Sequence, residues 1–221
     1  MTKLSLSDIN FRSASVISLL AVNLGLLVLG LILQWKIFDI IVIYWVENLV
    51  IGFYNIFKLA LASGRSNNSD DPEPPRLLLL PIFPIHYFGF CLVHGIFIMV
   101  LFSDMKPDPS QHFLLMTKPL FESASVIYGL IALLISHGIS FATNYVGKKE
   151  YLSATPTKQM FAPYKRIALV HVVVIVSGII VMYLGKDSAL LMIIFVLAKV
   201  ALDLRQHLME RKNANTLKTE Q

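Results

Sequence analysis

The sequence predicts an all-α polytopic membrane protein: a bundle of about six transmembrane helices with both termini in the cytoplasm. Three observations predict it. Hydrophobic residues make up 56% of the 221 residues and charged residues only 15%, too few for the surface of a soluble domain of this size. The apolar residues fall in runs of about 20, long enough to cross a hydrocarbon core as a helix. The basic residues lie mostly on one side of these runs.

Six apolar runs are the predicted spans of a single integral membrane domain covering residues 1–221. The first run is too long for the apolar region of a signal peptide, so we expect it to be retained. The spans are residues 11–33, 37–62, 77–102, 123–145, 167–184 and 188–207, followed by a cytoplasmic tail at 208–221. Residues 63–76, 103–118 and 147–166 are polar and are predicted to be loops. These loops are too short for a folded domain, so any chemistry lies in the membrane or at its faces.

The positive charges predict the orientation. Of the nineteen Lys and Arg residues, fourteen fall on the side of the termini and one, Lys199, within the last span. The other side holds four: Lys36, Lys106, Lys118 and Lys186. Short loops rich in positive charge remain cytoplasmic, so both termini are expected to face the cytoplasm. This asymmetry explains the net charge of +5 better than nucleic-acid binding does. The expected partner is therefore the lipid bilayer and not a nucleic acid.

Three histidines form the first candidate site, because ionisable groups within spans are costly in lipid and usually face the bundle interior. At 1.5 Å per residue, His86 lies about 13 Å, His137 about 12 Å and His171 roughly 6 to 10 Å from the cytoplasmic face. Three histidines from three helices thus fall in one predicted layer. Such a set can bind zinc, copper or iron, and two facing histidines can bind a b-type haem.

Two further polar sites are predicted within the spans. His94 lies about 12 Å further out than His86 on the same span, and Glu47 reaches a similar depth on the second span. Glu47 and His94 therefore form a candidate outer polar site. Lys199 and Asp203 are four residues apart on the last span and form a candidate buried ion pair.

Three functions remain open, and no catalytic residue is predicted. The first is a membrane protein that binds a metal ion or haem through the histidines, although no close metal-ligand spacing such as HExxH is present. The second is a small transporter or proton-coupled carrier using Glu47, Lys199 and Asp203; no inverted repeat is evident, which counts mildly against it. The third is a non-catalytic membrane subunit or assembly factor whose histidines only hydrogen-bond between helices. The sequence identifies no protein partner and leaves an oligomer open.

Several short motifs resemble those of a bacterial family of multi-spanning inner-membrane proteins of unknown function. They are residues 44–48 (YWVEN), 86–87 (HY), 94–95 (HG), 136–141 (SHGISF), 144–145 (NY) and 160–164 (MFAPY). The resemblance covers most of the chain, from the second span to the last. It implies a bacterial inner membrane and no particular reaction, and it transfers no catalytic residue.

Overall fold

The computed structural model describes residues 35, 37–65, 73–102 and 123–184, with single helical positions at 25, 28, 32, 193, 194, 196, 197, 200 and 201. The chain divides into two units, one made of Met1–Ile37 and Ile179–Gln221 and the other of Phe38–Gly178. Within the described residues all regular structure is helical and no strand is present, which confirms the predicted all-α class.

Three helices in the described part of the chain are long and apolar enough to span a membrane. They are α2 (Ile37–Leu61), α3 (Arg76–Phe102), and α5 (Ala124–Ser140) with its continuation, the π-helix η2 (Phe141–Val146). They occupy the positions of the predicted spans 37–62, 77–102 and 123–145. The predicted spans 11–33 and 188–207 lie outside the described residues apart from single helical positions, as does the tail at 208–221.

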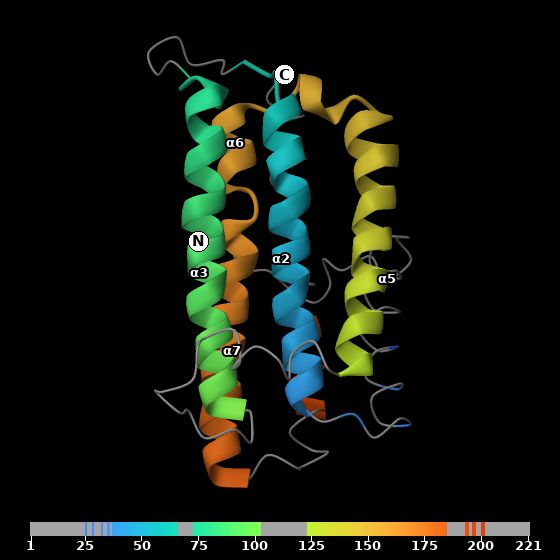
Figure 1. The fold of residues 1–221 in the computed structure, drawn as a ribbon, viewed down its shortest axis with the longest axis vertical. Helices are drawn as coiled ribbons and strands as arrows, with labels where there is room; N and C mark the ends of the chain where they lie inside the picture. The colour runs from blue at the N-terminus through green and yellow to red at the C-terminus, as the bar shows by residue number, and fades with distance from the viewer. Residues whose placement is uncertain are drawn as a thin grey trace, which may run out of the picture. The chain divides into compact units, whose positions relative to one another are not determined.

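Helix α2 lies between α3 and α5 in the unit Phe38–Gly178 (Figure 1). Residues 40–46 of α2 are all buried, so this helix forms the centre of the described bundle. The indole N–H of Trp45 donates to the Cys91 carbonyl of α3 at 2.8 Å. On the other side, the Tyr54 hydroxyl donates to the Leu134 carbonyl of α5 at 2.9 Å. These bonds fix the position of α2 against both neighbours.

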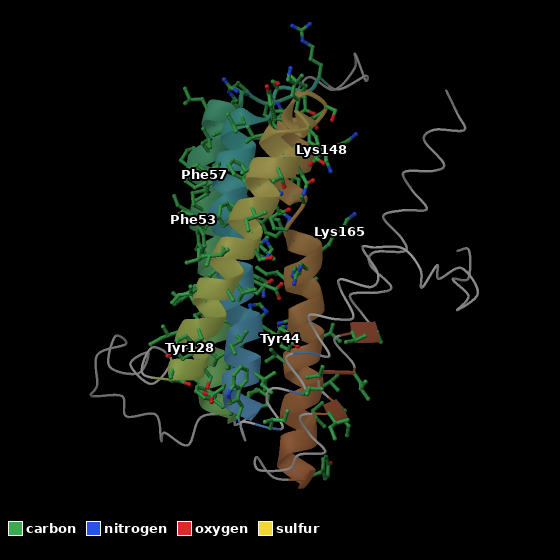
Figure 2. All side chains as sticks on the ribbon, turned by 90° about the vertical axis from the view of Figure 1, so that its right-hand side faces the viewer. Tyr44, Phe53, Phe57, Tyr128, Lys148 and Lys165 are labelled. Atoms are coloured by element: carbon green, nitrogen blue, oxygen red, sulfur yellow. The ribbon has the colours of Figure 1, made fainter. Side chains whose placement is uncertain are left out.

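The outer faces of the helices are apolar. Phe53 and Phe57 of α2 and Tyr128 of α5 point outward (Figure 2) and are 45%, 46% and 71% exposed. Helix α5 carries further exposed isoleucines, at Ile131 and Ile135. Contiguous apolar surface of this kind is rare on a soluble monomer and is suited to lipid contact.

Loop backbone closes one end of the bundle, which we call the basic end after its residues Arg65, Arg76, Lys148 and Lys149. The N–H groups of Ser63 and Gly64 donate to the carbonyls of Tyr151 and Ala154, each at 2.9 Å. A Cβ on Gly64 would lie 2.6 Å from the Ser153 carbonyl carbon, so only glycine allows this close approach. Between η2 and α6 the chain turns through the short 3₁₀-helix η3 (Glu150–Leu152).

The structure differs from the loop that the sequence predicts at residues 147–166. Helix α6 (Pro156–Phe161) begins within this segment, and α7 (Tyr164–Leu184) begins three residues before the predicted span. Helix α6 packs against α3, and α7 continues from it along the bundle (Figure 1). Two prolines and five basic residues interrupt the apolar pattern between residues 147 and 166, which explains why the sequence predicts a loop.

Candidate functional site

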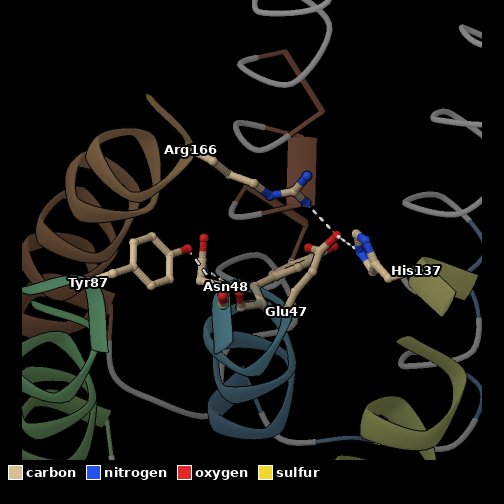
Figure 3. A network of polar contacts seen from close by, with 6 residues as sticks. Glu47, Asn48, Tyr87, His137 and Arg166 are labelled. Carbon is tan, nitrogen blue, oxygen red and sulfur yellow. Dashed lines mark hydrogen bonds and ion pairs between the residues drawn. The ribbon is translucent and has the colours of Figure 1, made fainter. Parts of the chain in front are cut away.

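Glu47 lies in the interior of α2 and contacts side chains from two other helices. It is fourteen residues before the end of α2 at Leu61, about 21 Å along the helix axis. Its carboxylate contacts the guanidinium of Arg166 on α7, and its Oε1 is 3.8 Å from Nε2 of His137 on α5 (Figure 3). We call Glu47, Arg166 and His137 the polar cluster. Its side chains are 14%, 27% and 28% exposed, so the cluster is shielded but not sealed.

The neighbouring residues hold Glu47 in position. Asn48 is 1% exposed, and its side-chain amide donates to the Tyr44 carbonyl at 2.9 Å. The Tyr87 hydroxyl of α3 donates to the Asn48 backbone carbonyl at 3.1 Å (Figure 3). Tyr87 packs against Gly52, where a Cβ would lie 2.4 Å from the tyrosine ring. The rotation of α2 against α3 is therefore fixed at the level of Glu47.

Asn48 also has an unsatisfied atom. Among the described residues, its buried Oδ1 has no hydrogen-bond partner. A buried polar atom without a partner costs roughly 1–3 kcal/mol.

Helix α6 positions the start of α7 so that Arg166 lies next to Glu47. The Gln159 side chain of α6 donates to Asn55 Oδ1 of α2 at 2.6 Å, and the Asn55 amide donates to the Gln159 carbonyl at 3.1 Å. This pair anchors α6 to α2 between the basic end and Glu47. The chain then passes Pro163 and starts α7, where Arg166 is in the first turn. The sequence places Arg166 in a cytoplasmic loop, so this residue of the site is missed. The sequence feature that could have indicated a nearby cation is Glu47, because a carboxylate inside a span needs a counter-charge.

Two interactions at the basic end stabilise the start of α6. The Thr155 hydroxyl caps the helix and accepts from the Lys158 N–H at 3.4 Å. The Thr157 N–H and hydroxyl donate to Glu73 Oε2 at 3.1 and 2.6 Å. Hydrogen bonding from Thr157 holds the pKa of the Glu73 carboxyl below its ordinary value of 4.5. A carboxylate at a helix N-terminus is favoured by the helix dipole, so Glu73 fixes where α6 begins.

The three histidines of the predicted metal layer have three different partners. His137 lies near Glu47, and His86 shares a hydrogen bond of 2.8 Å with the Tyr164 hydroxyl. His171 faces His94, with 2.5 Å between its Nδ1 and His94 Nε2. The predicted pairing of Glu47 with His94 likewise differs from these contacts. The predicted groupings rest on the depth of each residue along its span. Depth gives the height of a residue in the bundle but not the direction in which its side chain points. The early start of α6 also moves His171 further from the basic end, to the level of His94.

The spacing of His94 and His171 suits a hydrogen bond better than a metal site. Two nitrogen ligands on one tetrahedral metal, with bonds of about 2.0–2.1 Å, lie roughly 3.3 Å apart. His94 Nδ1 is 2.7 Å from the Phe90 carbonyl, which can only accept, so Nδ1 carries a proton and Nε2 is free to accept from His171. Within the described residues no group of three or more His, Cys, Asp or Glu side chains could hold a metal ion. The predicted ion pair Lys199–Asp203 lies outside the described residues.

Comparison with known proteins gives one match. The model of a family of unknown function (DUF6498) matches residues 5–220. No curated protein and no solved structure matches the chain.

Proposed function

The chain belongs to this family of unknown function, and we propose that it is a proton-coupled membrane carrier in which Glu47 binds and releases the proton. One observation carries the proposal: a carboxylate inside a membrane-spanning bundle contacts a cation from α7 and an imidazole from α5. Ionisable groups at such a depth are costly and commonly serve ion or proton pathways.

Glu47 has two states with different consequences for the helices. Ionised Glu47 neutralises Arg166 and draws α2 and α7 together. Protonated Glu47 leaves the guanidinium, which does not lose its own proton in proteins, without this counter-charge. Protonation therefore changes the free energy of the contact between the two helices, which is what coupling a proton to a conformational change requires. His137 is placed to pass the proton, since its Nε2 lies 3.8 Å from Glu47 Oε1.

We further infer that the protein resides in a bacterial inner membrane with the basic end in the cytoplasm. The positive-charge asymmetry of the loops and the resemblance of the motifs support this orientation. Arg65 follows α2, Arg76 begins α3, and Lys148 and Lys149 follow η2. The backbone bonds of Ser63 and Gly64 to Tyr151 and Ala154 bring these segments to one end of the bundle, which supports a cytoplasmic basic end. Labelling of single cysteines introduced at Arg65 or Lys148 in a cysteine-free background tests it. Reaction from the outside of intact cells would overturn the orientation.

Flux measurements in liposomes test the carrier. The full chain is reconstituted with a pH-sensitive dye inside, and a panel of small anions, cations and neutral solutes is added outside. We expect at least one solute to acidify the lumen, and we expect this response to be lost in E47Q. K165M is the matched control, because Lys165 is exposed and adjacent to Arg166 (Figure 2). Solute-driven acidification that persists in E47Q would contradict the role of Glu47. A wild-type protein that acidifies with no member of the panel would contradict the carrier.

A further inference from the structure

We propose that the solute is a small carboxylate, which replaces Glu47 on the Arg166 guanidinium when Glu47 is protonated. This inference rests on the proposed carrier function and assigns its substrate class. Three features carry it: the permanent charge of Arg166, the carboxylate that now neutralises it, and the partial exposure of both side chains.

Arg166 keeps its positive charge in either state of the site. Guanidinium remains charged at any physiological pH, and a charge of this kind is costly inside a membrane unless it is compensated. In the structure Glu47 supplies the negative charge. When Glu47 takes up a proton, the most direct replacement is another carboxylate, because the planar guanidinium matches carboxylate geometry with two parallel hydrogen bonds. The Arg166 side chain is 27% exposed, so the protein does not enclose it completely.

The exchange balances in charge. Before it, the site holds one guanidinium and the Glu47 carboxylate. One proton then enters from water and binds a Glu47 oxygen, and one carboxylate enters and binds Arg166. The summed charge of Glu47, Arg166 and the bound anion is then the same as that of the pair before, so proton and anion bind in a ratio of one to one. By linkage, each raises the affinity of the protein for the other.

The surrounding groups support this role for Glu47. Arg166 faces it from α7 and His137 from α5, while from α3 the Tyr87 hydroxyl bonds to the adjacent Asn48 carbonyl. Glu47 and Arg166 each make further interactions as well, so the exchange need not break every contact of either residue. The nearest described cation to Glu47 is thus the group that would hold the incoming anion.

Binding measurements on the detergent-purified full chain test the inference, with acetate and L-lactate as probes and chloride as the contrast. While Glu47 is ionised, we expect carboxylate affinity to rise as the pH falls, by about tenfold for each pH unit. We also expect uptake of one proton per anion in weak buffer. In E47Q, binding should be as tight at pH 8 as at pH 6. E47Q/R166M removes both charges, so it should fold but bind neither carboxylate, and K165M should bind as the wild type does.

Other results would overturn the inference. Carboxylate binding that survives in E47Q/R166M would show that Arg166 is not the binding group. Three other results would also overturn the inference. They are loss of binding in E47Q, absence of binding by the wild type between pH 5 and pH 8, and chloride binding as tight as that of both carboxylates. The two proposals fail separately. Linked binding without flux would reject the carrier and leave the anion site, whereas proton-coupled flux of a solute that is not a carboxylate would reject the substrate class alone.

Discussion

The guanidinium of Arg166 on α7 contacts the carboxylate of Glu47 on α2, inside the membrane-spanning part of the bundle. This contact depends on α6, which the Asn55–Gln159 pair holds against α2. Helix α6, which has the composition of a loop, therefore positions Arg166 to compensate the charge of Glu47. The pair joins two helices that are distant in sequence, so its loss affects both stability and any movement between them.

Removing one member of this pair is expected to destabilise the protein more than removing both. R166M removes the cation that contacts the Glu47 carboxylate, whereas E47Q/R166M removes both charges of the pair. Breaking a fully buried pair costs about 3–5 kcal/mol; since both side chains are partly exposed, we expect on the order of 2 kcal/mol for R166M and less than about 1 kcal/mol for the double variant. Thermal unfolding in detergent at pH 7 measures this, with K165M as control. A double variant less stable than R166M would contradict the expectation.

Two glycines on α3 provide a matched test of helix packing. A Cβ on Gly95 would lie 2.7 Å from Cζ2 of the Trp45 ring, whereas a Cβ on Gly89 has no atom within 4 Å. We expect G95A to push Trp45 away from the Cys91 carbonyl and to destabilise the protein by about 1–3 kcal/mol. G89A should be neutral, or stabilising by up to roughly 1 kcal/mol, because alanine favours a helix. Equal melting temperatures for the two variants would show that α2 and α3 pack less closely at Gly95 than the distance to Trp45 implies.

The sequence predicts the positions of α2, α3 and α5 well, because length and hydropathy determine whether a helix can cross a membrane. It also identifies Glu47 and His137 as polar residues at depth. It does not predict the position of Arg166, because the polar residues around α6 predict a loop. The residues that α6 contacts are also far away in sequence. It also does not predict that His94 faces His171. Such a contact depends on helix rotation and on where α6 begins, and neither can be derived from residue depth.

The start of α6 is expected to weaken at acidic pH. The folded pKa of Glu73 is depressed by hydrogen bonds from Thr157, so Glu73 contributes stability above its ordinary pKa of 4.5. This contribution should decrease as the pH falls below 4.5 and disappear below the folded pKa. Thermal unfolding of the wild type and E73Q between pH 3 and pH 7 measures it. We expect the difference in stability to be largest above pH 5 and to shrink in acid, and T157V should reduce the difference above pH 5. A difference that grows toward acid would contradict the assigned hydrogen bonds.

The geometry of the histidine pair predicts a tautomer. His94 Nδ1 lies 2.7 Å from the Phe90 carbonyl, so it must donate, and neutral His94 then has a bare Nε2. Because His171 Nδ1 faces that nitrogen at 2.5 Å, it must donate in turn. Nitrogen-15 NMR of histidine-labelled protein should therefore show both rings protonated at Nδ1, with the His94 pattern changed in H171F. Added zinc or copper should leave the His94 signals unchanged. A His94 protonated at Nε2 would contradict the pairing, and a metal-induced shift at His94 Nε2 would show that the two histidines separate to bind a metal.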